Sequence, residues 1–201
     1  HGPAGERRDR VVRSRGAGTE RRWLVFVHPS ADSALLVIDM QVGLYHGPER
    51  PFDAPRVLSN VTALITRARR DGIPIFAARH TGPVGSPIAA GSAAWQLLPE
   101  LGLDRERDLV FDKTRPSCFF ATDLADRLRA FGIGRLIVVG MKTQYCVDTT
   151  VRAASDLGFR VTLVADGHTC MDTPALRAEA IVAHHNDTLR GAFAEVVSTE
   201  A

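Results

Sequence analysis

One cysteine in this chain lies where a nucleophile could be activated. Cys146 comes shortly after the most apolar run, residues 136–139, and the residues that follow it carry apolar side chains at helical spacing. We therefore expect Cys146 at the N-terminus of a helix. Unpaired backbone N–H groups and the helix dipole lower the pKa of a thiol there, and the same N–H groups could hold an oxyanion. Position alone fits equally well a small apolar residue that fills a strand–helix junction.

Two charged residues follow other apolar runs. Asp39 ends the run that begins at residue 34, and Lys113 comes just after residues 109–111. A carboxylate at the end of a buried strand costs several kcal/mol unless it has a partner. Lys113 could supply the countercharge and stabilise negative charge that develops in a reaction. The alternative is a structural ion pair that joins two strand ends.

The apolar runs alternate with amphipathic stretches, which is typical of strand–helix–strand units with a parallel sheet. The expected strands are residues 34–40, 73–79, 109–112, 135–140, 160–165 and 194–198. The expected helices are residues 55–70, 122–131, 146–157 and 174–187. Ligands of open parallel sheets bind beyond the carboxyl ends of the strands. There we expect Asp39 with Gln41, His80, Lys113, residues 141–146 and residues 166–168.

Helix ends have their own signals. Thr122 is a candidate N-cap, Pro174 suits a first helical position, and Gly72, Gly132 and Gly158 follow expected helix ends. The connection from residue 80 to residue 98 is long and rich in Gly and Pro. Loops of this length in a compact domain usually cover a site.

Composition separates an N-terminal arm from one globular domain. Residues 1–30 hold seven of the 25 basic residues and three of the 23 acidic ones, so the rest of the chain is slightly acidic. We predict a basic, flexible arm over residues 1–30 and a domain over residues 31–201. A body without a basic face predicts no nucleic-acid partner. The apolar residues 23–27 could form an extra edge strand, pack against a neighbouring subunit, or come from cloning or a start-site artefact.

Cysteine spacing and the apolar segments of the sequence bear on the cellular compartment and the oligomeric state. Three cysteines without a close-spaced pair indicate a reducing compartment. No run approaches the ~20 apolar residues of a membrane helix, and the N-terminus lacks the apolar segment of a signal peptide. We expect a cytoplasmic protein without a membrane partner. An exposed apolar segment at residues 23–27 favours a homo-oligomer, a dimer or tetramer.

Several ordered blocks of the sequence resemble the isochorismatase-like cysteine hydrolase family over roughly residues 33–200. They are residues 34–41, residues 111–113 with Ser117, residues 119–120 and 122–124, residues 139–140 with Thr143, residues 146–147 with Thr150, residues 153–154 and 158–159, and His184, His185, Asn186 and Leu189. The resemblance implies an α/β, three-layer Rossmann-like fold with a six-stranded parallel sheet flanked by helices. It also implies a catalytic triad of Asp39, Lys113 and Cys146.

The same resemblance implies a cis peptide bond between Met141 and Lys142, with the backbone N–H groups of Lys142 and Cys146 as the oxyanion hole. It predicts cleavage of a C–N bond in a small amide, ureido, imide or lactam substrate through a cysteine thioester. Isochorismatases proper act on a vinyl ether and lack the cysteine, so Cys146 argues against an isochorismatase-type hydrolase. A further alternative is a non-catalytic binding protein of the same fold. The presence of all three triad residues argues against it.

Metal-dependent relatives, the nicotinamidases, carry an Asp-x-His and a further His after the second strand. Here that strand ends at His80 without a second His or Asp nearby, so we predict no metal and no cofactor. His80 is then either a substrate contact or an anchor of the loop. Other candidate substrate contacts, each of which could equally be a core or interface residue, are Gln41, Trp95, Phe119 or Phe120, and Tyr145.

Three other features complete the predictions. Lys142 departs from the small or apolar residue usual in the family, and it would favour an anionic substrate if its side chain reached the pocket. Cys118 and Cys170 lack an activating neighbour, so we expect them to be buried spectators. His184 and His185 face different directions on a helix, which makes a metal site from this pair unexpected.

Overall fold

The structure is a computed structural model that describes residues 32–200. The predicted arm, residues 1–30, and the apolar segment 23–27 lie outside the described residues. Among the helices of the described part, none combines the length and apolar character needed to cross a membrane.

The centre of the molecule is a six-stranded sheet in which every pair of neighbours is parallel, in the order β3-β2-β1-β4-β5-β6. The strands are β1 (Ser33–Ile38), β2 (Ile75–His80), β3 (Leu109–Lys113), β4 (Arg135–Met141), β5 (Arg160–Thr169) and β6 (Glu195–Val197). The predicted fold class and all six strands are confirmed. β5 runs four residues further than predicted because His168 and Thr169 continue to pair with the end of β4.

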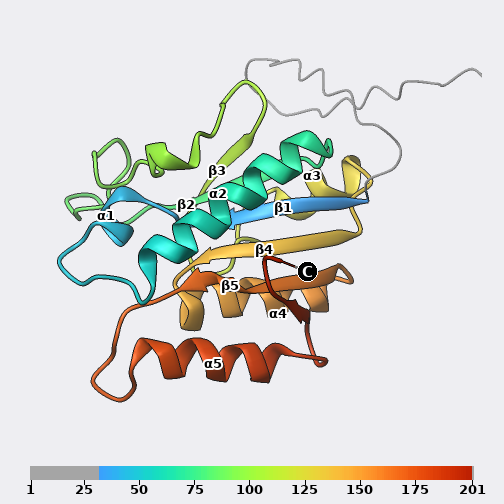
Figure 1. Cartoon of the computed structure of the whole chain (residues 1–201). Coiled ribbons are helices and arrows are strands. Elements are labelled where there is room, and N and C mark those ends of the chain that lie inside the picture. Colours follow the sequence, from blue (N-terminus) through green and yellow to red (C-terminus); the bar gives the residue numbers. More distant parts are fainter. Residues whose placement is uncertain (1–31, 201) are drawn as a thin grey trace, which may run out of the picture.

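Helices cover both faces of this sheet. On one face lie α1 (Val42–Tyr45), α2 (Ala54–Arg70) and the 3₁₀ turn η1 (Pro99–Leu101), and on the other α3 (Leu124–Ala130) and α4 (Asp148–Asp156). In Figure 1, α2 passes in front of the strands, with α3 and α4 behind them. The last helix, α5 (Ala178–Leu189), contacts β5, α4 and the turn η2 (Thr143–Val147).

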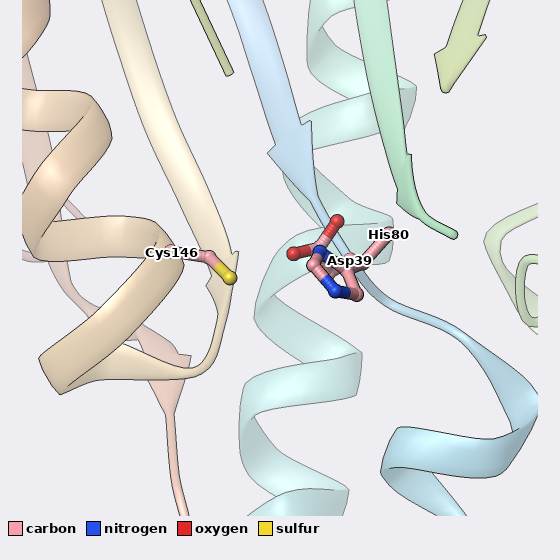
Figure 2. A group of neighbouring side chains, drawn as sticks. All are labelled: Asp39, His80 and Cys146. Atoms are coloured by element: carbon pink, nitrogen blue, oxygen red, sulfur yellow. The ribbon is translucent and has the colours of Figure 1, made fainter. Parts of the chain in front are cut away.

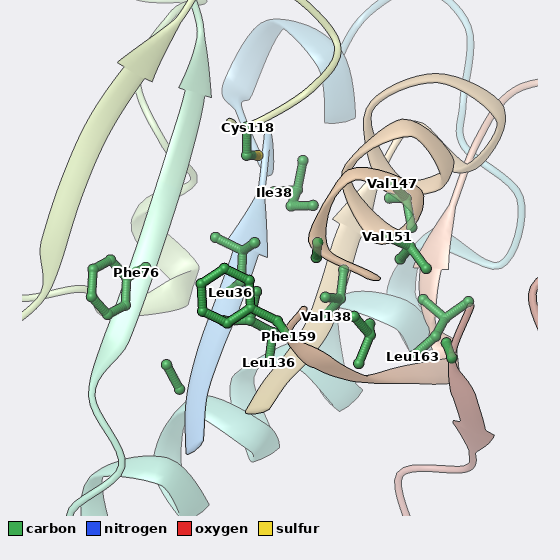
Figure 3. Packing of buried hydrophobic residues seen from close by; sticks show 14 of the residues in the cluster. Leu36, Ile38, Phe76, Cys118, Leu136, Val138, Val147, Val151, Phe159 and Leu163 are labelled. Atoms are coloured by element: carbon green, nitrogen blue, oxygen red, sulfur yellow. The ribbon is translucent and has the colours of Figure 1, made fainter. Parts of the chain in front are cut away.

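Alternation along β1 builds the two cores. Leu35 and Val37 pack toward α2, whereas Leu36 and Ile38 pack on the α4 side with Val151. Figure 3 shows the second cluster between the sheet and α4. Successive side chains of a strand point to opposite faces, so a strand covered on both faces must be apolar throughout. This requirement explains why β1 and β4 read as continuous apolar runs.

The predicted helix ends are partly correct. Gly72, Gly132 and Gly158 all have positive φ directly after helices, as predicted. α3 begins at Leu124, so its N-cap position falls on Asp123 and the prediction for Thr122 was one residue early. The prediction for Pro174 was wrong, because α5 begins only at Ala178. There the Asp172 carboxylate accepts the N–H of Ala178 at 2.8 Å, which satisfies one free donor of the helix end.

Gly140 is the residue at which β4 and β1 approach too closely for a side chain. Its φ is +125°, and a Cβ would collide with the carbonyl oxygen of Ile38. We expect Gly140→Ala to lower the free energy of unfolding by about 3 kcal/mol or more, because backbone strain and the clash add. Gly158→Ala is the matched control: its φ is +87°, but nothing lies within 4 Å of a Cβ. Urea denaturation of both variants tests this, and equal losses would contradict it.

Candidate active site

Topology brings the predicted site residues to one edge. The strand order reverses direction between β1 and β4, and in sheets of this kind the crevice at the reversal is where ligands bind. Asp39 directly follows β1, and Cys146 lies in the turn η2 that follows β4. The prediction that residues at the carboxyl ends of the strands converge is therefore met for these two residues.

Asp39 is held in an unusual backbone conformation and is fully buried. Its φ is +50°, a region that residues other than glycine rarely adopt, and its side chain has no exposed surface. Its Oδ2 accepts a hydrogen bond from Lys113 Nζ at 2.6 Å, and the Lys113 side chain is equally buried. Lys113 also donates to the Arg115 carbonyl at 3.2 Å. The expected partner of the Asp39 carboxylate is therefore present, carried by β3 two strands away.

The electrostatics of this pair follow from burial. Desolvation raises the pKa of Asp39, although the positive charge of Lys113 acts in the opposite direction. Burial is the largest single effect on Lys113 and disfavours its charge, but the charge of Asp39, the hydrogen bond to it and the nearby Cys118 and Cys146 together raise the pKa of Lys113. A carboxylate with a raised pKa is a better proton acceptor than one exposed to water.

Cys146 occupies a π-helical turn, with α4 starting two residues later. Burial raises the pKa of its thiol to about 12, and the nearby negative charge of Asp39 adds to this effect. The predicted lowering of the pKa by a helix N-terminus is therefore wrong. Desolvation is the largest effect on this thiol and the neighbouring carboxylate adds to it, and both disfavour the thiolate. The resting side chain is a thiol, and attack on a substrate requires that its proton be taken.

His80, at the end of β2, completes a group of three side chains. Single ligand atoms of Asp39, His80 and Cys146 lie within 4.8 Å of one another, and Figure 2 shows the sulfur turned toward the carboxylate and the imidazole. The buried atoms Asp39 Oδ1 and His80 Nδ1 have no hydrogen-bond partner. Burial lowers the pKa of His80, and the charge of Lys113 lowers it further. The site thus offers a neutral imidazole beside a carboxylate and a thiol.

Carboxylate, imidazole and thiol are all possible metal ligands. However, the Lys113 ammonium group bonds the Asp39 carboxylate at 2.6 Å and repels a second cation there. This arrangement suits proton transfer better than metal binding. The absence of a metal and of a cofactor stays a prediction.

Gln41 does not fit its predicted role as a substrate contact. Its side chain is fully buried, and its Nε2 donates to the carbonyls of His80 at 3.0 Å and Trp95 at 2.8 Å. Its Oε1 accepts the backbone N–H of His80 at 2.8 Å. Every amide atom is used by the backbone, so Gln41 ties the end of β1 to β2 and to the loop.

The loop after β2 lies against the residues that follow β1. Backbone N–H groups of Val42 and Gly43 donate to carbonyls of Gln96 and Ala94, at 2.9 and 2.8 Å. Trp95 Nε1 donates to Thr81 Oγ1 at 2.8 Å, and the Arg79 guanidinium carbon lies 3.6 Å from the centroid of the Trp95 ring. These contacts fix the loop beside the site edge, and Trp95 as a substrate contact stays a prediction.

The remaining aromatic candidates divide into two groups. Phe119 stacks on Phe159 at 5.9 Å between ring centroids and packs on the hydrophobic core. Phe159 precedes β5, at the amino end of the sheet, so this partner directs Phe119 to the core and the predicted substrate contact does not fit. Phe120 and Tyr145 are more than half exposed, and Tyr145 adjoins Cys146. Contact of these two with a substrate stays a prediction.

The other predictions for single residues have mixed outcomes. Cys118 and Cys170 are fully buried, and burial raises their pKa values to about 12 and about 11, so both fit the predicted spectator role. The peptide bond between Met141 and Lys142 is cis. A buried polar chain formed by Thr143, His168 and Asn186 was missed from the sequence. The sequence placed Thr143 and His168 beyond strand ends and included Thr143 and Asn186 in the family resemblance, but nothing in it indicated that the three side chains are bonded to one another.

Comparison with known proteins supports the same fold. A family model described as the isochorismatase domain matches residues 33–201. A streptothricin hydrolase of Streptomyces noursei is 37% identical over 143 residues, covering 71% of this chain and 51% of that protein. The uncharacterized isochorismatase family protein YddQ of Bacillus subtilis (strain 168) is 31% identical over 184 residues, covering 84% of this chain and 97% of that protein.

A crystal structure of an isochorismatase from Pseudomonas putida KT2440 superimposes with a TM-score of 0.78 at 31% identity, covering 86% of this chain and 92% of that one. The chain spans about half the length of the streptothricin hydrolases that it matches, 51% and 56%. With a matched domain that covers all but the first 32 residues, the chain belongs to the isochorismatase family.

Proposed function

We propose that this protein is a cysteine hydrolase that cleaves a C–N bond of a small amide, ureido, imide or lactam substrate. The observation that carries the proposal is the buried Asp39–Lys113 pair, joined at 2.6 Å, with the Cys146 sulfur beside it at the switch point of the sheet. An acid–base group and a nucleophile side by side are the parts that covalent hydrolysis requires.

The first half of the reaction moves the Cys146 proton to Asp39 as sulfur attacks the carbonyl carbon. The raised pKa of Asp39 suits a proton acceptor, and because burial raises the thiol pKa to about 12, the nucleophile needs such an acceptor beside it. Lys113 keeps its charge beside Asp39 and stabilises the negative charge that forms. The proton on Asp39 then passes to the leaving nitrogen as the C–N bond breaks, which leaves a thioester.

In this first half of the reaction, backbone N–H groups stabilise the oxyanion. The Lys142 carbonyl accepts hydrogen bonds from Tyr145 and Val147, at 3.1 and 3.2 Å, and the Cys146 N–H is not among its donors. We assign the N–H groups of Lys142 and Cys146 to the oxyanion of the tetrahedral intermediate. Lys142 needs only its main chain for this role.

The second half hydrolyses the thioester. Asp39 takes a proton from water, the hydroxide attacks the acyl carbon, and sulfur leaves as a thiol with the proton from Asp39. His80 presents an unpaired Nδ1 to the same space, which favours a polar contact with substrate over a role as a loop anchor. The acid product then leaves.

The substrate class rests on this chemistry and on two relatives, both named streptothricin hydrolase. The decisive experiment measures ammonia or amine release from a panel of ureido compounds, primary amides, cyclic imides and lactams. A single class should be turned over, with a Cys146-linked acyl adduct visible by mass spectrometry after acid quenching. Release without any adduct would refute the thioester, and no release from the whole panel would favour a binding relative. A cytoplasmic location, a homo-oligomer, and the absence of nucleic-acid partners remain predictions.

A further inference from the structure

A buried polar chain lies behind the nucleophile and takes no part in the chemistry described above. His168 is 1% exposed, and both of its ring nitrogens are bonded. Nδ1 lies 2.9 Å from Thr143 Oγ1, and Nε2 lies 2.9 Å from Asn186 Oδ1. Asn186 Nδ2 in turn donates to the Ala165 carbonyl at 3.1 Å. Buried polar groups of this kind are costly unless all of them are paired.

The donors and acceptors along this chain of hydrogen bonds are fixed by its last bond, the one from Asn186 to the Ala165 carbonyl. Because Asn186 Nδ2 must face the Ala165 carbonyl, its Oδ1 faces His168 and can only accept. His168 Nε2 therefore carries the proton, and Nδ1 accepts the hydroxyl hydrogen of Thr143. This arrangement needs a neutral imidazole. Burial lowers the pKa of His168 to about 4, so the ring is neutral near pH 7.

The chain ends in the turn that carries the active cysteine. Thr143, itself fully buried, is the first residue of η2, and Cys146 is the fourth. Thr143 follows Lys142 directly. Asn186 belongs to α5, a helix that packs on η2 and β5. The turn η2, β5 and α5 are thus joined through the ring of His168.

We infer that His168 and Asn186 are positioning residues, which through Thr143 hold the turn that bears Cys146 and the two oxyanion N–H groups. The inference rests on the proposed function. Neither residue touches the reacting atoms, so they act on the rate through geometry. Misplacement of a reacting group by about 1 Å can slow a reaction roughly 100-fold.

Asn186→Leu and Asn60→Leu form a matched pair. Asn60, on α2, donates from Nδ2 to the Asp166 carbonyl at 2.8 Å, next to the carbonyl that Asn186 bonds. Both substitutions remove a side-chain hydrogen bond to the β5 backbone, but only Asn186→Leu also breaks the chain to Thr143. We expect kcat to fall roughly 10- to 100-fold in Asn186→Leu with little change in KM, and to stay near wild type in Asn60→Leu.

A second pair of variants tests the two ring nitrogens of His168 separately. In an asparagine the amide lies near the position of Nδ1, and in a glutamine near that of Nε2. His168→Asn can still accept the Thr143 hydroxyl hydrogen, whereas His168→Gln keeps only the partner of Asn186. We expect kcat to fall in the order wild type, His168→Asn, His168→Gln. The reverse order, or equal values for the two variants, would overturn the role of the Thr143 bond.

Hydrogen exchange of the amides at residues 142–148, measured by mass spectrometry, needs no substrate. We expect exchange there to accelerate at least about 10-fold in Asn186→Leu and His168→Gln and not in Asn60→Leu, because a released turn opens more often. Unchanged exchange in Asn186→Leu would overturn the inference, as would a kcat equal to that of Asn60→Leu. If the substrate panel is inactive, the proposed function fails, and exchange still decides whether this chain holds the turn.

Discussion

Replacing Cys146 with alanine is expected to abolish turnover and leave the fold intact. If the sulfur forms the thioester, no other group can take its place, and the rate should fall by roughly 10⁴-fold or more. The side chain is small and only partly buried, so the free energy of unfolding should change by less than about 1 kcal/mol. Product release and urea denaturation of the purified variant measure the two effects.

Cys118 and Cys170 provide the matched controls for that substitution. Both are fully buried free thiols with raised pKa values, and neither belongs to the group shown in Figure 2. Alanine at either position should cost stability by leaving a cavity, while the rate per folded molecule stays near wild type. Turnover that survives in Cys146→Ala, or disappears equally in all three variants, would contradict the nucleophile assignment.

Replacing Asp39 with asparagine is expected to lower turnover and at the same time make the Cys146 thiol more acidic. Turnover should fall roughly 10²- to 10⁴-fold, because the proton acceptor is lost. The thiol should nevertheless become more acidic. The charge of Asp39 raises the pKa of Cys146 and that of Lys113 lowers it, so removing the first leaves only burial to oppose the second. Iodoacetamide, which reacts with the thiolate, should label Cys146 at lower pH than in the wild type.

Asp112→Asn controls for the loss of a charge at this edge of the sheet. Asp112 bonds Arg79 Nε at 2.8 Å, is about half exposed, and belongs to the same strand as Lys113. Its substitution should change neither turnover nor the pH dependence of labelling by more than a small factor. If Asp39→Asn loses turnover while labelling keeps its wild-type pH dependence, the electrostatic account of the thiol is wrong. Wild-type turnover would remove Asp39 from the mechanism.

Local patterns were sufficient to predict the sheet and the helices that cover it. Each predicted strand contains a short apolar run and the four predicted helices show their own periodicity, so neither needs knowledge of distant residues. The four-residue helix α1 and the polar end of β5 were not predicted. Helix ends were less certain. Pro174 has the chemistry of a first helical residue, yet Asp172 supplies the bond at Ala178, four residues later. A start signal is only one of several competing ways to satisfy the free N–H groups of a helix end.

Site residues were predictable by type and less so by function. Asp39, Lys113 and Cys146 follow apolar runs, which is enough to bring them to one edge of a parallel sheet. Gln41 has the same placement, but whether its amide meets substrate or backbone depends on where the loop after His80 returns. Phe119 likewise finds its partner in Phe159, forty residues away. No spacing along the chain encodes such a pairing.

The sequence by itself determined which site residue comes with which strand: Asp39 directly after β1, Lys113 at the end of β3, and Cys146 in the turn after β4. Only the tertiary structure decided the ionisation of these groups and the support behind them. Burial and the Asp39 charge raise the pKa of Cys146, whereas its place in the sequence predicted a lowered one. The bonds from Asn186 through His168 to Thr143 join α5, β5 and the turn. The physical reason is that desolvation and hydrogen bonding depend on all neighbours in space, whereas periodicity depends only on neighbours in sequence.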